Sequence, residues 1–168
     1  DLSPDYRLRE DALHRAGYDE PPPDAEERAR FVYGLPELTR DPLRGARRVA
    51  APGCFATALQ LAVVPAARQG LLDDDRPWFL SGVTGSSGSG IEPKSGTHHP
   101  HRHGNFWAYG IEGHRHEAEL RQALEGTGLA PAVCFVPHSG PFARGIHLTV
   151  CLPLAQPLSG ADAHALFA

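Results

Sequence analysis

The sequence predicts an α+β fold, in which a sheet is covered by helices on one face. Residues 55–68 are apolar almost all round, as in a buried helix. The apolar residues of 146–152 alternate with His147, Thr149 and Cys151, which is the period of a strand. Helices and strands follow one another irregularly and no repeat is present, which favours α+β over a βαβ series.

Length and composition set further limits. The chain has 168 residues, 41% of them hydrophobic, which suits one folded domain of ordinary size. A net charge of −4 argues against a general nucleic-acid binder. No apolar run approaches the roughly 20 residues that a membrane span needs, and the first residues do not resemble a signal peptide. Three cysteines are an odd number that fits a reducing compartment, so we expect a cytoplasmic protein.

The other elements follow from local patterns. Residues 10–16 form a short expected helix, and residues 24–32 a second one with Asp24 as its N-cap. The stretch 33–37 interrupts this pattern, and Gly70 is a plausible stop for the buried helix. The remaining expected elements are a strand at 78–83, a flexible small-residue loop at 84–90, an irregular histidine-rich segment at 98–103, a helix at 117–124 and a strand at 132–136.

Cys54 lies in Pro52-Gly53-Cys54, directly before the buried helix. The dipole and the unpaired N–H groups of a helix N-terminus stabilise a thiolate, the reactive form of cysteine. The Pro-Gly pair permits a tight turn there. A buried, inert thiol is the competing interpretation of this segment alone. Cys134 and Cys151 lie in expected strands and are interpreted as structural.

Histidine is abundant, with ten residues in the chain. His114 could serve Cys54 as an acid–base partner, because imidazole titrates near neutral pH. His114 and His116 are two residues apart, which is not the spacing of a helical zinc site, so no metal is expected. For His98, His99, His101 and His103 we expect a solvated polar loop.

The residues alone do not decide the roles of two further features. The Gly/Ser stretch from Thr84 to Gly88 could bring backbone N–H groups to a phosphate or to an oxyanion, or it could be a plain surface loop. It is neither a Walker motif nor a dinucleotide fingerprint. Arg144 precedes a strand and offers a fork that matches carboxylate or phosphate, although its type and position favour an exposed surface charge.

In their order, these signals resemble the N-acyl-γ-glutamyl-phosphate reductases of arginine biosynthesis. The related reductases of a carrier-bound aminoadipyl phosphate, in lysine biosynthesis, are also similar. The segments that carry the resemblance are Asp1-Leu2-Ser3-Pro4-Asp5-Tyr6-Arg7-Leu8, Tyr33-Gly34-Leu35-Pro36-Glu37-Leu38, Pro52-Gly53-Cys54, Ser81-Gly82-Val83-Thr84-Gly85, Gly113-His114-Arg115-His116 with Glu119, Phe135-Val136-Pro137-His138 and Arg144-Gly145-Ile146.

The resemblance implies a two-domain enzyme of the aspartate-semialdehyde and glyceraldehyde-phosphate dehydrogenase group. It implies that residues 1–48 are the end of an NADP-binding Rossmann domain. Residues 49–168 would be an incomplete catalytic and dimerisation domain with a mixed sheet. NADP(H) would be bound mainly by a domain that this chain lacks, so the chain alone is expected to be inactive. The absence of methionine fits a processed product or a piece of something longer.

The resemblance also assigns residues. Cys54 is similar to the nucleophile and His114 to the acid–base residue, with His116 and Glu119 in support. Arg144 corresponds to the arginine that contacts acidic groups of the substrate. The loop Thr84, Gly85, Ser86, Ser87, Gly88 corresponds to the nicotinamide and phosphate side.

Some residues depart from the arginine enzymes, which commonly have Tyr-Pro where this chain has Phe55-Ala56. The expected substrate is N-acetyl-γ-glutamyl phosphate, a small acyl phosphate. The first alternative is the aminoadipyl phosphate on an acidic amino-group carrier protein. A non-catalytic dimerisation fragment and a histidine-rich metal binder are further alternatives. A homo-oligomer is expected, and nucleic-acid or membrane partners are not.

Overall fold

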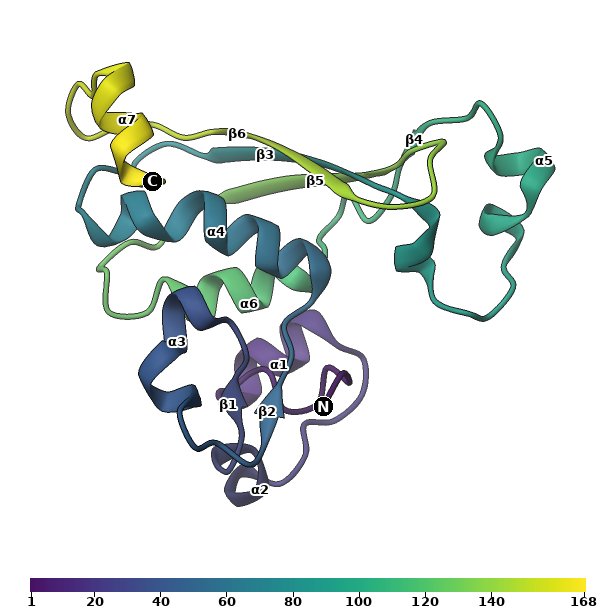
Figure 1. Cartoon of the computed structure of the whole chain (residues 1–168), viewed down its shortest axis with the longest axis horizontal. Helices are drawn as coiled ribbons and strands as arrows, with labels where there is room; N and C mark the ends of the chain where they lie inside the picture. Colours follow the sequence, from purple (N-terminus) through teal and green to yellow (C-terminus); the bar gives the residue numbers. More distant parts are fainter.

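The computed structural model describes all residues, 1–168, and its centre is a four-stranded mixed sheet. The strand order is β4 (Trp107–Ala108), β5 (Val133–Ser139), β3 (Trp78–Thr84) and β6 (Ile146–Cys151). β3 runs parallel to β5, whereas β6 and β4 are antiparallel to their neighbours. Two helices, α4 (Cys54–Arg68) and α6 (His116–Ala123), cover one face of the sheet (Figure 1). The predicted α+β class is confirmed.

Helix α4 is buried because its apolar residues surround it. Phe55, Leu59, Val63 and Val64 are at most 1% exposed and join the core beneath the sheet. The sheet makes room for the helix at Gly82, where an added Cβ would lie 2.4 Å from the Phe55 ring. Gly70, at φ +65°, follows the helix end as the sequence predicts.

The pairing register divides the sheet into two chemically different faces. Leu80, Phe135 and Val150 are register partners on the inner face, which packs on α4 and α6. The outer face is not covered by any helix (Figure 1). Three rows of register partners line it. These rows are Cys134–Phe79–Cys151, Val136–Ser81–Thr149 and His138–Val83–His147.

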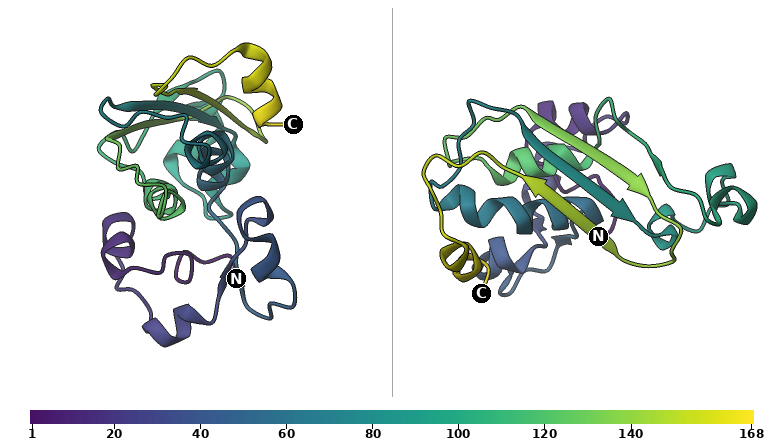
Figure 2. Two further views of the ribbon diagram at one scale, coloured as in Figure 1. Left: turned by 90° about the vertical axis from the view of Figure 1, so that its left-hand side faces the viewer. Right: turned by 90° about the horizontal axis from the view of Figure 1, so that it is seen from above.

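The first 50 residues form a second layer beneath the helices (Figure 1, Figure 2). They contain α1 (Asp11–Gly17), α2 (Ala25–Ala29), β1 (Val32–Tyr33), α3 (Pro36–Leu43) and β2 (Val49–Ala50). The carboxylate of Asp24 caps α2 by accepting the N–H groups of Glu26 and Glu27, as predicted. Helix α2 is shorter than expected, because the chain continues into β1, which pairs in parallel with β2. Gln122 on α6 joins the two layers by bonding the backbone of both Arg7 and Arg9.

Two peripheral parts complete the chain. Residues 85–106 form an arm at one end of the sheet, with 3₁₀ turns η1 (Ser86–Ser89) and η2 (Ser95–Thr97) and helix α5 (His99–Arg102) (Figure 1). The histidine-rich segment, expected to be irregular, is therefore partly helical. Helix α7 (Gly160–Leu166) lies at the opposite end. None of the helices combines the length and hydropathy that crossing a bilayer demands.

Candidate active site

Cys54 is the first residue of helix α4, and its side chain is exposed. Gly53 is the N-cap and has no side chain that could satisfy the first-turn N–H groups. Its carbonyl accepts the N–H of Thr57 at 2.8 Å and so begins the helix directly at the cysteine. The thiol therefore lies at the positive end of a 15-residue helix, as the sequence predicts.

A cleft of about 740 Å³ opens at this helix end. Its walls come from the start of α4, the loop after β3, the arm, and the segment before α6. Cys54 and His114 both line it, so the structure brings the predicted nucleophile and its predicted partner to one cavity. The residues that line the cleft include Cys54, Thr84, Gly88, Lys94, Arg102, Trp107, Tyr109, His114, Arg115, His116 and Ser139.

His114 is held in place at the edge of this cleft. Its backbone N–H donates to the Glu117 carboxylate at 2.9 Å, and its Nδ1 accepts the His116 N–H at 3.3 Å. The Phe55 and Phe135 rings contact the imidazole edge-on. Because Nδ1 accepts, the proton of the neutral ring is assigned to Nε2. His114 can then donate from Nε2 to an oxygen in the cleft.

Both imidazoles are neutral in the folded protein at pH 7. Burial, and then the Arg115 charge, lower the pKa of His114 to about 4. Burial, followed by the charge on His114, lowers the pKa of His116 to about 3. Tyr109 lines the same cleft as Cys54, and burial, followed by the charge on Cys54, raises the pKa of its hydroxyl.

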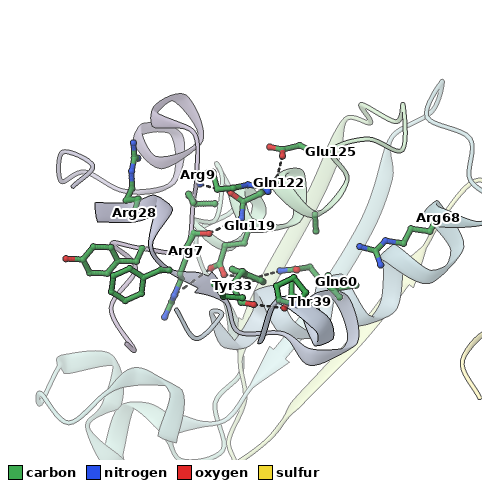
Figure 3. A pocket seen from close by; sticks show the side chains of 17 residues that line it. Arg7, Arg9, Arg28, Tyr33, Thr39, Gln60, Arg68, Glu119, Gln122 and Glu125 are labelled. Carbon is green, nitrogen blue, oxygen red and sulfur yellow. Dashed lines mark hydrogen bonds and ion pairs between the residues drawn. The ribbon is translucent and has the colours of Figure 1, made fainter. Parts of the chain in front are cut away.

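Glu119 is fully buried and holds the turn that precedes Cys54. Its carboxylate accepts the Gly53 N–H at 3.1 Å and the Tyr33 hydroxyl at 2.7 Å. Arg7 lies 3.6 Å away and balances the charge, and Tyr18 donates at 3.4 Å. Figure 3 shows Glu119, Tyr33 and Arg7 meeting in a second cavity, of about 350 Å³, between the N-terminal layer and α6. Burial, and then the Glu119 charge, raise the pKa of Tyr33 far above its ordinary value, so its hydroxyl stays a donor.

His116 packs directly against Gly53. A Cβ at this glycine would lie 2.3 Å from Nε2 of His116, so only glycine fits the turn. His116 is 4% exposed and its ring meets that of His114 edge-on, with centroids 4.7 Å apart. The predicted supporting residues thus act on different targets: His116 contacts His114 and the turn, whereas Glu119 binds the turn, Tyr33, Tyr18 and Arg7.

The backbone N–H groups of the Gly/Ser loop are already bonded within the protein. The N–H groups of Gly85, Ser86 and Ser87 donate to carbonyls of residues 142–145, and that of Gly88 donates to Gly85. Thr84 and Gly88 nevertheless line the cleft. The loop has therefore no spare N–H between 85 and 88 for an anion.

Arg144 is exposed and is not among the residues that line the cleft. Its backbone lies against Gly85, where a Cβ would meet the Arg144 nitrogen at 2.7 Å. The role that the family resemblance assigns to this arginine stays a prediction.

Sequence reasoning missed Arg102, Trp107 and Tyr109, which all line the cleft. Arg102 stood in a polar segment that we expected to be solvated, yet it is 8% exposed. The alternation of Trp107 and Tyr109 about Ala108 was the one available signal of a strand that turns two aromatic rings to the same side.

The remaining titratable clusters lie outside the cleft. His98, His99, His101 and His103 are exposed on the arm. Oxygens of Asp73, Asp74 and Asp75 come within 4.8 Å of one another, but Asp74 accepts the Ala130 N–H and Asp73 accepts that of Asp75. Cys134 and Cys151 lie in strands, as predicted, but their side chains are exposed on the outer face.

Comparisons with known proteins identify a family that matches more than half of the chain. The family described as semialdehyde dehydrogenase, dimerisation domain, matches residues 54–168. A protein of Ignicoccus hospitalis, provisionally named LysW-L-2-aminoadipate/LysW-L-glutamate phosphate reductase, is 44% identical over the whole chain and 47% of its own length. The N-acetyl-gamma-glutamyl-phosphate reductase of Marinobacter nauticus is 41% identical over 94% of this chain and 46% of its own length.

The LysW-L-2-aminoadipate 6-phosphate reductase of Deinococcus radiodurans is 44% identical over 75% of this chain and 36% of its own length. The chain thus spans about half the length, or less, of the curated relatives that it matches.

Proposed function

Because the chain belongs to the semialdehyde dehydrogenase family, we propose that it carries the reactive centre of an NADPH-dependent acyl-phosphate reductase. One observation carries the proposal: the exposed thiol of Cys54 stands at the start of α4 in the same cleft as His114. A nucleophile, a neighbouring acid–base group and helix-end N–H groups are what acyl transfer requires. The reaction would reduce the acyl phosphate to a semialdehyde.

The first half of the proposed reaction is acyl transfer to sulfur. The Cys54 thiolate attacks the acyl carbon, the bond from carbon to the phosphate oxygen breaks, and inorganic phosphate leaves. The first-turn N–H groups of α4 would hold the negative charge that develops on the acyl oxygen. A thioester on Cys54 results.

In the second half the thioester is reduced and cleaved. When bound, NADPH supplies the hydride that this step consumes. His114 would donate a hydrogen bond from Nε2 to the alkoxide that forms, and this intermediate collapses to the aldehyde and the Cys54 thiolate. His116 and Glu119 would be positioning residues, since they hold His114 and the Gly53 turn.

The chain offers only part of a dinucleotide site. It contains no strand–GxGxxG–helix unit, the motif that places a pyrophosphate at a helix N-terminus. Thr84 and Gly88 of the loop 84–88 would lie beside the reacting nicotinamide end, because they share the cleft with Cys54. Arg144, near the same loop, is proposed to contact acidic groups of the substrate.

The N-terminal layer is proposed to be the end of the cofactor domain, with residues 49–168 as the catalytic and dimerisation domain. Parallel sheets are built from several strands with both faces covered. An isolated parallel pair such as β1–β2 is therefore expected to belong to a larger sheet.

A second copy of the chain is proposed to cover the outer sheet face. The nine residues of its three rows include no Asp, Glu, Lys or Arg, which is unusual for a face left in water. Phe79 is 49% exposed at the centre of one row. The family description as a dimerisation domain supports a contact between two copies.

Two substrates remain candidates. N-acetyl-γ-glutamyl phosphate is the first, and an aminoadipyl phosphate on an acidic carrier protein is the second, because relatives with both names match nearly equally. Parallel assays of the longer parent polypeptide with both acyl phosphates would separate them by kcat/KM.

Thiol alkylation tests the proposal on this chain. A short unstructured peptide with a single cysteine is the reference, because Cys134 and Cys151 lie on the outer face that a second copy is proposed to cover. At pH 7, mass spectrometry should show Cys54 reacting with iodoacetamide about tenfold faster than the reference thiol. A rate equal to that of the reference thiol would contradict a preserved active site. In the longer parent polypeptide, Cys54→Ser should abolish turnover.

A further inference from the structure

The cleft beside Cys54 is a cationic cavity without an acidic wall. Lys94, Arg102 and Arg115 line it, whereas none of its lining residues is Asp or Glu. Both lining histidines are neutral at pH 7, so they neither add to this charge nor cancel it. An anionic ligand is therefore the chemical complement of the cleft.

Arg102 is the one member of this set that is built into the wall. It is 8% exposed, whereas Lys94 and Arg115 are exposed. Its guanidinium forms no ion pair and lies over the Trp107 ring, 5.8 Å from the centroid. A charge buried without a counter-charge is costly, and an anion delivered by a ligand would compensate it.

Neutral acceptors fix the guanidinium in place. Nη1 donates to Ser139 Oγ and Nη2 donates to the Gly140 carbonyl, each at 2.7 Å. Both acceptors lie at the end of β5, and the Gly140 N–H in turn bonds the Thr84 carbonyl at 2.9 Å. Only two of the five N–H groups of an arginine are used in this way. The rest stay available on a side chain that needs no further ordering.

We propose that Arg102, anchored on Ser139 and Gly140, is the anion-binding residue of the Cys54 cleft. It would hold a phosphate or carboxylate group of the substrate while the acyl carbon meets the thiol. This inference rests on the proposed function for the identity of the substrate, but anion binding itself can be measured without turnover. The exposed Arg144, which does not line the cleft, would then be at most a contact at its rim.

Tryptophan fluorescence offers a direct measurement. The chain has two tryptophans: Trp107, against the Arg102 guanidinium, and Trp78, which is 0% exposed in the core. Titration of the chain with inorganic phosphate should therefore change the Trp107 signal in a saturable way. Titration with N-acetylglutamate, which carries carboxylates and no phosphate, shows which oxyanion is preferred. No saturable response to either anion would overturn the proposal.

Variants then assign the binding to one residue. Arg102→Gln should weaken the binding of the preferred anion at least about tenfold, as expected for hydrogen bonds to a charged group. Arg102→Lys, which keeps the charge but not the fork, should be intermediate, and circular dichroism checks that each variant is folded. Arg121→Gln is the matched control, because Arg121 is an exposed arginine on α6 outside the cleft. Unchanged affinity in folded Arg102→Gln, or an equal loss in Arg121→Gln, would overturn the proposal.

The rate of Cys54 alkylation separates this inference from the proposed function. If Arg102 binds the anion but Cys54 reacts no faster than the reference peptide thiol, the anion site stands and the reductase assignment is removed. If Cys54 is alkylated fast but Arg102→Gln leaves the anion affinity unchanged, the reductase assignment stands and the anion site is removed. If both hold, the preferred anion should slow alkylation of Cys54 in the unmodified chain and not in Arg102→Gln.

Discussion

At the scale of single residues, the site depends on how closely Gly53, Cys54 and His116 pack. The His116 ring occupies the space that a side chain at Gly53 would need. The turn therefore has one conformation, and the thiol begins the helix without a competing cap. The position of the sulfur is set by a steric contact and not by a bond to its own side chain.

The steric contact can be tested with Gly53→Ala. Its φ of −64° suits alanine, so any destabilisation comes from the clash with His116. We expect the free energy of unfolding, measured in urea, to fall by about 1–3 kcal/mol. In a His116→Ala background the same change should cost much less. Equal costs in both backgrounds would contradict this account.

Histidine burial should make stability depend on pH. An unfolded histidine titrates near 6.5, whereas His116 titrates near 3 in the fold, so the unfolded state binds more protons in between. The free energy of unfolding should fall as the pH drops below about 6.5, by up to about 1.4 kcal/mol per pH unit from His116. His114, with its lowered pKa, makes stability fall with pH in the same direction. Urea titrations at pH 7.5, 6.5 and 5.5 measure the dependence of the free energy of unfolding on pH, which should become weaker in His116→Gln.

The candidate site was only partly predictable from residues. Cys54 could be placed because a Pro-Gly turn before an apolar run has a local meaning. Arg102 could not, because its partners Ser139 and Gly140 lie 37 and 38 residues away in the chain. An arginine among exposed histidines carries no local sign that a strand end will bury it.

At the scale of elements, the buried Glu119 on α6 links three pieces of the chain. It reaches the turn before α4, the strand β1 through Tyr33, and the N-terminal segment through Arg7. Its charge is balanced by Arg7, whose side chain is 10% exposed. Removing the carboxylate therefore leaves a buried charge and an unpaired N–H.

For Glu119→Ala we expect a loss of about 3–5 kcal/mol in the free energy of unfolding. Glu119→Gln should cost less, because an amide oxygen can still accept the Gly53 N–H. Glu125→Gln is the control, since its pair with Arg9 is exposed and should be worth under about 1 kcal/mol. Chemical denaturation of the three variants measures how much each loses in free energy of unfolding. An equal loss in Glu119→Ala and Glu125→Gln would contradict the proposed role of Glu119 in linking these segments.

Prolines account for two of the helices that the sequence did not predict. Helices α3 and α5 each carry a proline in the first turn, Pro36 and Pro100, where it needs no N–H partner. The same prolines, taken with nearby Gly and His residues, favoured breaks and irregular structure. The helices α4 and α6 and the strands β3, β5 and β6 were predictable, because each has an uninterrupted apolar period.

At the scale of the whole molecule, the two faces of the sheet differ in how far they are covered. The inner face is buried by α4 and α6, but the outer face exposes Phe79 in rows that contain no Asp, Glu, Lys or Arg. This asymmetry was not visible in the sequence, because alternation tells which residues share a face and not what covers it.

Self-association should therefore respond to Phe79. Phe79→Lys places a charge at the centre of the outer face and should shift the chain from dimer toward monomer in light scattering. Ile91→Lys is the control, since Ile91 is 95% exposed on the arm, away from the sheet. A dimer that survives Phe79→Lys, or one lost equally in Ile91→Lys, would place the contact elsewhere.

The shared carboxylate of Glu119 also makes the thiol sensitive to distant events. Any displacement of the first 50 residues must pull on the same oxygens that hold the Gly53 N–H, so the motion is transmitted to the start of α4. Coupling of this kind works in both directions. A group attached to Cys54 and a ligand held by the N-terminal layer would each change the affinity for the other, through the one side chain of Glu119.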